Sequence, residues 1–506
     1  MRVQISPSVP ISYYLMEGNK MNELLKGLKK QSNYTFTENG AKTHISTLNN
    51  CLDLFAIGGA IKNSPNINKE DMIDDCLAED ELLAMKLLFY LRDVRGGLGE
   101  GKTFKVMLKH IANTKPYLVK KNIELIPYYG RWDDILVLMD TKCKKEAVEL
   151  IRNTLIKDLN SKSPTLLAKW LPSENASSSE TRVMARRLAK ELKLSKRNYR
   201  KILSVLRKRI KIVETFLTEK DYDKIEFSKL PSRAGLMYKN AFMRHEELKD
   251  RYLEFINSKD SKVHADVLYP YEIIEKVRRA RTNDEKKICE KYWDNQIDYL
   301  EGKKYNILPV IDTSASMTWG NGKVVPIDVA ISLGLYCAER NKGDFYNHYI
   351  SFSREAKLIE IKGDTLADKV RRIYRANLCQ NTNIESVFDL VLETIEENNL
   401  DEDCLPDSIV IISDMEFDRG AYVKNSSKTL MENIRAKWLA HGYKMPNLVY
   451  WNVNARQKNI PEVGKDGISY VSGCSPSIFK SVLTGKTGYE LMLEVLNSER
   501  YSLIKV

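Results

Sequence analysis

The stretch ILPVIDTSAS, residues 307–316, decides the fold of the second part of this 506-residue chain. It joins a short apolar run to a loop with one aspartate and two serines. This pattern is typical of a buried strand that ends in a polar loop. Similar β-rich runs follow at 344–353, 356–361, 407–414, 447–453 and 468–473, separated by helix-patterned stretches at 324–341, 364–377, 384–399 and 428–442. This alternation predicts a doubly wound α/β domain over residues 303–506, its mostly parallel sheet covered on both faces.

Residues 1–302 show a different pattern. From about Asn22 to Lys287, apolar residues recur at three- and four-residue spacing, as in ELLAMKLLFYLRDV (81–94) and RKILSVLRKRIKIVETFL (200–217). Such spacing predicts amphipathic helices. Successive helices without strands are typical of a helical-repeat, HEAT-like solenoid, so we expect an all-α N-terminal module. The fold class should change near residues 290–303.

Basic residues are unevenly distributed between the two parts. The chain has a net charge of +12, yet residues from 303 onward hold one more acidic than basic residue, and those before hold 13 more basic ones. This asymmetry favours an anionic partner for the N-terminal module. The alternative is a lysine-rich surface that only aids solubility.

Three sequence patterns bear on the cellular compartment of the protein: a secretion signal, a membrane span and the spacing of the cysteines. Residues 1–20 have no continuous apolar core of a secretion signal, and no run of 18 apolar residues occurs. The eight cysteines are scattered, without the spacing of a zinc site. We therefore expect a cytoplasmic protein with reduced thiols and no membrane contact.

Polar residues follow the predicted strands where a ligand would bind. In an open α/β sheet, ligands bind beyond the carboxyl ends of the strands, where crossovers diverge. Hard oxygen atoms from three loops suit a divalent cation, with Mg²⁺ as the preferred candidate. The candidate metal ligands are Asp312, Ser314, Ser316, Thr382 and Asp414. Alternatively, Ser316 or Thr318 caps the next helix and Asp414 lies in a turn.

A second motif suggests nucleotide binding. Residues 96–103, GGLGEGKT, satisfy the pattern of a phosphate-binding loop. Such a loop needs a buried strand before it, so that backbone amides and a helix N-terminus face the phosphates. The preceding ELLAMKLLFYLRDV is helix-patterned, so we expect neither nucleotide hydrolysis nor any other enzymatic activity.

A basic helical stretch is the candidate RNA-binding surface. Residues 181–214 hold thirteen basic residues and two acidic ones. Like charges three or four residues apart destabilise a helix unless an anion such as a phosphate backbone neutralises them. The candidates are Arg186, Arg187, Lys190, Lys196, Arg197, Arg200, Lys201, Arg207, Lys208 and Arg209. A solvated helix face is the alternative.

Two further pairs combine charge with an aromatic ring. Arg131 and Trp132, and Arg244 and His245, could stack on bases or contact phosphates. The alternative is that they fix loops between helices.

The DxSxS strand end, with the later threonine and aspartate, resembles the metal-ion-dependent adhesion site of von Willebrand A domains. The resemblance implies that Ser314, Ser316 and Thr382 supply hydroxyl groups to the ion. It also implies that Asp312 and Asp414 contact the ion directly or through water. One coordination position is then left for a carboxylate of a partner, so the domain binds and does not catalyse.

Several segments of the N-terminal module resemble the TROVE module of Ro-type RNA-binding proteins, which joins helical repeats to a von Willebrand A domain in this order. They are TENGAKTHISTLNNCLDLFAIGGA (37–60), LLFYLRDVRGGLGEG (87–101), IPYYGRWDDIL (126–136) and VHADVLYPYEII (263–274). Other segments, including KWLPSENASS (169–178) and SDMEFD (413–418), resemble even more a family of unknown function with the same build. For Ro-type proteins the resemblance implies a central hole for single-stranded RNA ends and a basic rim for duplex RNA.

These observations predict a non-enzymatic RNA-binding or ribonucleoprotein scaffold. Its metal site would bind an acidic protein ligand, either from a second protein or from the chain's own acidic segment. A protein-assembly adaptor that uses the metal site without any nucleic acid is the alternative. RNA binding predicts a steep loss of affinity as salt rises, which separates the two.

Overall fold

The computed structural model describes residues 24–506, except 26, 30, 303, 320–323, 353–354, 377–380, 421–427, 465 and 483–484. The expectation that residues 1–20 lack a secretion signal therefore falls outside the described residues, as does Cys379. The other seven cysteines are free thiols.

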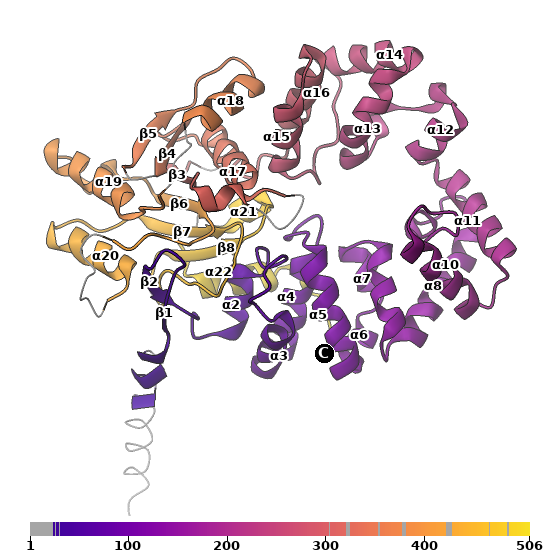
Figure 1. The fold of residues 1–506 in the computed structure, drawn as a ribbon, viewed down its shortest axis with the longest axis horizontal. Helices are drawn as coiled ribbons and strands as arrows, with labels where there is room; N and C mark the ends of the chain where they lie inside the picture. Colours follow the sequence, from indigo (N-terminus) through magenta and orange to yellow (C-terminus); the bar gives the residue numbers. More distant parts are fainter. Residues whose placement is uncertain are drawn as a thin grey trace, which may run out of the picture.

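Figure 1 shows a six-stranded sheet at one side of the molecule and an arc of helices that leaves it and returns to it. The strands are β3 (Ile307–Asp312), β4 (His348–Phe352), β5 (Lys357–Glu360), β6 (Ser408–Ser413), β7 (Asn447–Asn452) and β8 (Ile468–Ser472). The helices of this α/β domain are α17 (Pro326–Arg340), α18 (Leu366–Ala376), α19 (Glu385–Glu397), α20 (Leu430–Ala440), α21 (Phe479–Val482) and α22 (Gly488–Leu496). All six predicted strand runs and the four predicted helices between them are confirmed.

The strand order places one pair of strands at the centre of the sheet. The order is β5-β4-β3-β6-β7-β8, and every pairing is parallel except that of β4 with β5. The chain builds outward from β3 to β5 and then returns to place β6 on the other side of β3. The connections therefore diverge between β3 and β6, which is where open α/β sheets bind ligands. Both strands are fully buried Val/Ile-rich runs, as expected between two helical layers.

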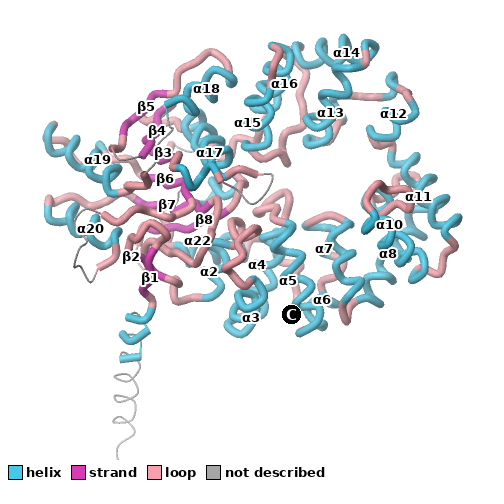
Figure 2. The backbone as a smooth tube through the Cα atoms, in the orientation of Figure 1, coloured by secondary structure: helices cyan, strands magenta, loops and turns pink. Residues whose placement is uncertain are grey.

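The N-terminal module is mostly helical, as predicted (Figure 2). Its helices are α2 (Asn50–Ile57), α3 (Lys69–Glu79), α4 (Glu81–Arg92), α5 (Gly101–Thr114), α6 (Pro116–Lys121), α7 (Leu125–Tyr129), α8 (Lys144–Asn160), α9 (Leu167–Trp170), α10 (Ser179–Glu191), α11 (Lys196–Ile210), α12 (Val213–Glu219), α13 (Ser232–Arg244), α14 (Glu246–Asn257), α15 (Pro270–Arg279) and α16 (Asn283–Asp294).

The expectation of an all-α module is wrong at one place. A hairpin of β1 (Tyr34–Phe36) and β2 (Lys42–His44) precedes the first labelled helix. Gly40 adopts a φ of 85° in its turn, a conformation that glycine adopts without strain. The hairpin packs on the α/β domain: the amide of His44 donates to the carbonyl of Ile460 at 3.1 Å, and the reverse bond is 2.9 Å.

Both ends of the helical arc contact the α/β domain. At one end α2 packs on β8, and the amide of Gly59 donates to the hydroxyl of Ser472 at 2.9 Å. At the other end α15 packs on α17 and α18, where Arg278 forms an ion pair with Asp328. The arc and the sheet thus close into one ring-shaped molecule (Figure 1). Within the described ranges, no helix combines the length and apolar character needed to cross a bilayer.

Candidate functional site

Two aspartates meet at the point where the connections of the sheet diverge. Asp312 is the last residue of β3, and Asp414 directly follows β6. The two strands are parallel neighbours, with Ile311 opposite Ile412. Both aspartates are buried, with 0% and 1% of their surface exposed. The prediction that these two carboxylates share one sheet edge agrees with this geometry.

The serines of the DxSxS loop lie on the same edge. The amide of Ser314 donates to Oδ1 of Asp312 at 2.9 Å, and the hydroxyl of Ser413 donates to Oδ2 at 2.5 Å. The hydroxyls of Ser314 and Ser316 are 3.0 Å apart, and that of Ser316 is hydrogen-bonded to Asp414. Oxygen atoms from β3, its loop and the end of β6 therefore form one cluster.

The helix-cap alternative for Ser316 does not match this arrangement. The next α-helix, α17, begins after Val325 without a side-chain cap bond, and the short 3₁₀ helix over Ala315–Thr318 begins after Ser314, also without one. Thr318 instead donates to the carbonyl of Ala315 at 2.7 Å. The turn alternative for Asp414 is partly present, because its Oδ1 accepts the amide of Glu416 at 3.2 Å.

Thr382, the fifth predicted ligand, contacts the N-terminal hairpin and the segment that follows Asp414. The side-chain amide of Asn39 donates to the carbonyl of Glu416 at 2.6 Å and lies 3.4 Å from the hydroxyl of Thr382. The amide of Thr382 is fixed by Asp418 at 2.8 Å. Thr382 is thus held next to the segment that follows Asp414.

The electrostatics of the cluster favour a cation. Burial, and next the charge of Asp414, raise the pKa of Asp312. Burial also raises the pKa of Asp414, whereas Arg456 opposes this rise. Two buried carboxylates that destabilise each other's charge, surrounded by hydroxyl oxygens, fit a hard divalent ion. No three His, Cys, Asp or Glu side chains of the described residues gather as a metal-binding group, so a cation here would also need hydroxyl and water oxygens.

Two charged residues at this edge, Arg456 and Glu38, were not predicted from the sequence. Nη2 of Arg456 lies 3.0 Å from Oδ2 of Asp414, and Nη1 lies 2.5 Å from Oε2 of Glu38 in the hairpin turn. Arg456 follows β7, whose carboxyl end lies at the same edge, so its place along the chain was an available signal. Glu38 gave no signal, because its approach depends on the docking of a hairpin more than 370 residues away along the chain.

A hollow of about 190 Å³ opens beside the oxygen cluster. The α/β domain lines it with Ser316, Trp319 and residues 454–456, and the helical module with residues 63–65. Trp319 is 80% exposed, which is unusual for a large aromatic side chain. The predicted metal site therefore opens into a pocket built by both modules, here called the metal-site pocket.

The basic stretch forms two helices, α10 and α11, and α11 lines a large open hollow together with α12 and the loop after α9. This hollow of about 960 Å³, here called the α11 cleft, is lined by five of the predicted residues: Arg197, Arg200, Lys201, Arg207 and Lys208. Lys169 from α9, which the sequence did not single out, also lines it. Buried Tyr199, Leu203 and Leu206 pack α11 on the module, and Tyr199 and Leu203 also line the cleft.

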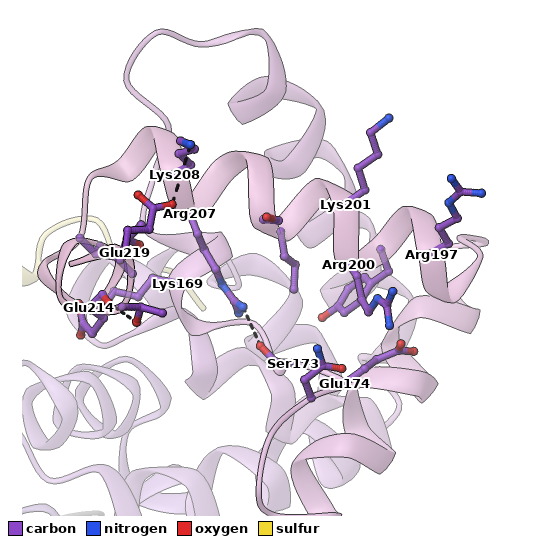
Figure 3. A pocket seen from close by; sticks show the side chains of 17 residues that line it. Lys169, Ser173, Glu174, Arg197, Arg200, Lys201, Arg207, Lys208, Glu214 and Glu219 are labelled. Carbon is purple, nitrogen blue, oxygen red and sulfur yellow. Dashed lines mark hydrogen bonds and ion pairs between the residues drawn. The ribbon is translucent and has the colours of Figure 1, made fainter. Parts of the chain in front are cut away.

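The ten predicted RNA-binding residues differ in whether their side chains are bonded within the chain or exposed. Figure 3 shows Arg197 and Lys201 extending away from α11, whereas Arg207 reaches across to Ser173. Arg207 also donates to the carbonyls of Ala168 at 2.8 Å and Leu171 at 2.9 Å, and burial lowers its pKa. It therefore fixes the loop after α9.

Arg187 and Arg209 also have partners within the chain. Arg187 donates to Asp140 and to the carbonyl of Met139, and Arg209 to the carbonyl of Leu159. Exposed side chains remain at Arg186, Lys190, Lys196, Arg197, Arg200, Lys201, Lys208 and Arg209.

The two aromatic pairs have loop-fixing contacts. Arg131 forms an ion pair with Asp133 at 2.9 Å, and its guanidinium lies 4.4 Å from the ring centroid of Trp170. Trp132 is half-buried against the core. The ring of His245 lies tilted against that of Tyr222, with ring centroids 4.8 Å apart. Arg244, next to it, is exposed.

The glycine-rich loop donates its amides to its own chain. The amides of Gly97 and Gly99 donate to the carbonyl of Asp93, and that of Leu98 to the carbonyl of Tyr90. The carboxylate of Glu100 caps α5 by accepting the amides of Lys102 and Thr103. Helix α4 precedes the loop, as predicted. The amides that a phosphate would need are therefore already bonded.

The chain matches two family models. Residues 37–169 and 164–304 match the family described as Domain of unknown function (DUF2828), over more than half of the chain. The chain belongs to this family. Residues 306–500 match a second one, Domain of unknown function (DUF7788). The DUF2828 part thus contains the second strand of the hairpin, the glycine-rich loop and the α11 cleft, and the DUF7788 part contains the oxygen cluster.

Two similar proteins complete the comparison. An uncharacterized protein of Acanthamoeba polyphaga mimivirus is 26% identical over 510 residues, covering 90% of this chain and 85% of its own length. Among solved structures, the Ro (RSR) protein of Deinococcus radiodurans aligns with a TM-score of 0.49 and 12% identity, covering 87% of this chain and all of that one.

Proposed function

We propose that the protein is a non-enzymatic RNA-binding scaffold. In it, a HEAT-like helical module of the TROVE type is joined to a von Willebrand A-type domain with a metal-dependent ligand site. The observation that carries the RNA-binding role is the α11 cleft, which presents exposed Arg197, Arg200, Lys201 and Lys208 beside an open hollow of about 960 Å³. Side chains of this kind bind the phosphate backbone without sequence preference.

The acidic side chains near the lysines of the cleft also bear on its role in RNA binding. Lys208 lies 3.9 Å from Glu219, at the margin of an ion pair, and Lys169 forms an ion pair with Glu214 at 3.4 Å. An exposed pair such as Lys208–Glu219 contributes little to stability, so a phosphate can replace the carboxylate of Glu219 at small cost. Arg197, Arg200 and Lys201 form no ion pair among the described residues.

The metal-dependent role rests on the oxygen cluster. Mg²⁺ would be held by the carboxylates of Asp312 and Asp414 and the hydroxyls of Ser314, Ser316 and Thr382. When bound, the ion supplies a positive centre that accepts an oxygen of an acidic ligand. The residues of this chain keep the ligand oxygens at one edge of a rigid sheet, because β3 and β6 are fully buried.

A protein-assembly adaptor without an RNA role is the second candidate. It is favoured by the exposed ring of Trp319 at the metal-site pocket, because exposed aromatic side chains are enriched at protein interfaces. The two candidates differ in the role of the α11 cleft.

The test measures binding of a fluorescent single-stranded RNA oligonucleotide at several salt concentrations. The triple variant Arg186→Glu, Arg197→Glu, Lys208→Glu should weaken binding and flatten the plot of log affinity against log salt by about 2 units, since each single-strand contact contributes about 0.7. The matched control Lys342→Glu, Lys357→Glu, Lys444→Glu changes three exposed lysines of the α/β domain. It should leave both quantities unchanged. Negligible RNA affinity of the parent at low salt would leave only the adaptor.

A further inference from the structure

A second hollow adjoins the metal-site pocket on the helical module. It has a volume of about 650 Å³ and is lined by residues 62–70 and the start of α5. Its cationic side chains are Lys62, Lys69 and Lys102, and it is here called the lysine pocket. Residues 63–65 line both hollows. A ligand that leaves the metal-site pocket over this short loop therefore reaches the lysine pocket next.

The positive charge of the lysine pocket is only partly balanced: Glu70 is its one acidic lining residue, against three lysines. Nζ of Lys69 donates to the carbonyl of Ser64 at 3.0 Å, and Nζ of Lys102 donates to Oδ1 of Asn63 at 3.1 Å. Both acceptors are neutral. In the part of the chain that the structure describes, none of the three lysines forms an ion pair. Hydrogen bonds to neutral acceptors thus hold the ammonium groups of Lys69 and Lys102 in place, and their charge can still attract an anion.

Two acidic side chains lie at this hollow and have other contacts: Glu70 lines it, and the charge of Glu100 raises the pKa of Lys69 against the larger opposing effects. Glu70 lies 3.5 Å from a ring nitrogen of His110, and Glu100 caps α5 through the amides of Lys102 and Thr103. Burial, and next the charge of Lys102, lower the pKa of Lys69. The first turns of α3 and α5, helices of 11 and 14 residues, also line the hollow, and helix N-termini add positive potential. An external anion would relieve this repulsion.

The size of the metal-site pocket limits what can occupy it. At about 190 Å³ it is smaller than the roughly 300 to 1,000 Å³ of small-molecule sites, so it fits a side chain rather than a nucleotide. A cation held by Asp312 and Asp414 would favour a carboxylate there. Beside it, the exposed ring of Trp319 offers an apolar contact for a polypeptide.

We propose that the two hollows form one docking track for an acidic polypeptide segment. One carboxylate of the segment binds at the metal site, and the acidic side chains that follow cross residues 63–65 and contact Lys62, Lys69 and Lys102. This inference rests on the metal site of the proposed function. It extends the binding of an acidic ligand beyond the metal site and places half of the interface on the helical module.

The test uses the full-length protein and a fluorescein-labelled octaglutamate peptide, with binding followed by anisotropy in Mg²⁺ and in EDTA. The variant Lys62→Glu, Lys69→Glu, Lys102→Glu should lose about tenfold or more in affinity, because three favourable contacts become repulsive. The control Lys342→Glu, Lys357→Glu, Lys444→Glu has the same change in net charge and should stay within about twofold of the parent. A triple change to glutamine, with an intermediate loss expected, serves if the charge reversal impairs folding.

The outcomes separate the track from the metal site. Weaker peptide binding by the lysine variant, by Asp312→Asn and in EDTA supports the whole track. If EDTA and Asp312→Asn weaken binding but the lysine variant does not, the metal site stands and the track is wrong. If only the lysine variant weakens binding, the peptide does not bind at the metal site. That result contradicts both the metal site of the proposed function and the joint track. A lysine variant that loses affinity for an oligouridylate RNA but not for the peptide would also overturn the proposal.

Discussion

Arg456 holds one of the two central aspartates from outside the sheet: its Nη2 lies 3.0 Å from Oδ2 of Asp414. The other guanidinium nitrogen contacts Glu38 in the turn of the N-terminal hairpin. The same carboxylate of Asp414 is a predicted metal ligand, so the guanidinium and a divalent ion compete for its charge. The hairpin, through Arg456, would thereby be linked to the state of the proposed metal site.

We predict that Arg456→Gln increases the affinity for Mg²⁺. The variant removes a cation that already neutralises Asp414, and it leaves two buried carboxylates to be balanced by the ion alone. A gain of about tenfold corresponds to about 1.4 kcal/mol, the scale of one partly exposed charge contact. Isothermal titration of the full-length protein with Mg²⁺ measures it.

Glu38→Gln is the control for this effect. It weakens the outer contact of Arg456 and leaves the guanidinium on Asp414, so the Mg²⁺ affinity should change less than in Arg456→Gln. Equal or weaker Mg²⁺ binding by Arg456→Gln would show that the guanidinium does not compete with the ion.

A second prediction concerns the glycine-rich loop. Gly99 has a φ of 65°, and a Cβ there would lie 1.6 Å from the hydroxyl of Tyr269, which donates to the carbonyl of Leu98. Gly99→Ala should therefore cost about 3 kcal/mol, from a left-handed backbone and displacement of a packed ring. Gly302→Ala, at a φ of 77° with nothing within 4 Å, should cost only about 1 kcal/mol. Urea unfolding of both variants compares the two.

The same pair of variants addresses nucleotide binding. If the glycines serve close packing, neither variant nor parent shifts the melting temperature on addition of ATP and Mg²⁺. A nucleotide-dependent rise in the parent that is lost in Gly99→Ala would instead assign the loop to phosphate binding.

A third prediction separates structural from binding arginines on α11. Arg207→Lys loses the planar donors that bond two carbonyls and the hydroxyl of Ser173, so it should cost about 1 to 3 kcal/mol in unfolding free energy. Arg200→Lys, with an exposed side chain, should stay within about 0.5 kcal/mol of the parent. Comparable losses in the two variants would contradict the loop-fixing role of Arg207.

The sequence predicted those parts of the molecule that depend on local pattern. Val/Ile runs gave the strands, and the rule for parallel sheets brought Asp312 and Asp414 to one edge. The helical spacing of α11 predicted an exposed basic face, but not that Arg207 turns inward, because that depends on the loop after α9. Glu38 and the lysine pocket were missed for the same reason: each arises where segments distant in the sequence pack together, and no periodicity records such packing.

The last prediction tests how the chain's end joins the two modules. Asp93, fully buried after α4, accepts bonds from Arg500 at 2.6 Å and from the hydroxyl of Tyr501 at 3.0 Å. Asp93→Asn removes the charge that balances Arg500, which should cost about 3 kcal/mol in urea unfolding. Lys505→Ala, whose side chain is exposed, is the control and should have little effect.

Because Asp93 also accepts the amides of Arg95 and Gly96, its loss should loosen the glycine-rich loop together with the tail. Amide exchange in Asp93→Asn should therefore accelerate both in residues 95–100 and in residues 499–505. Exchange that accelerates in the tail alone would show that the C-terminal segment does not fix this loop of the helical module.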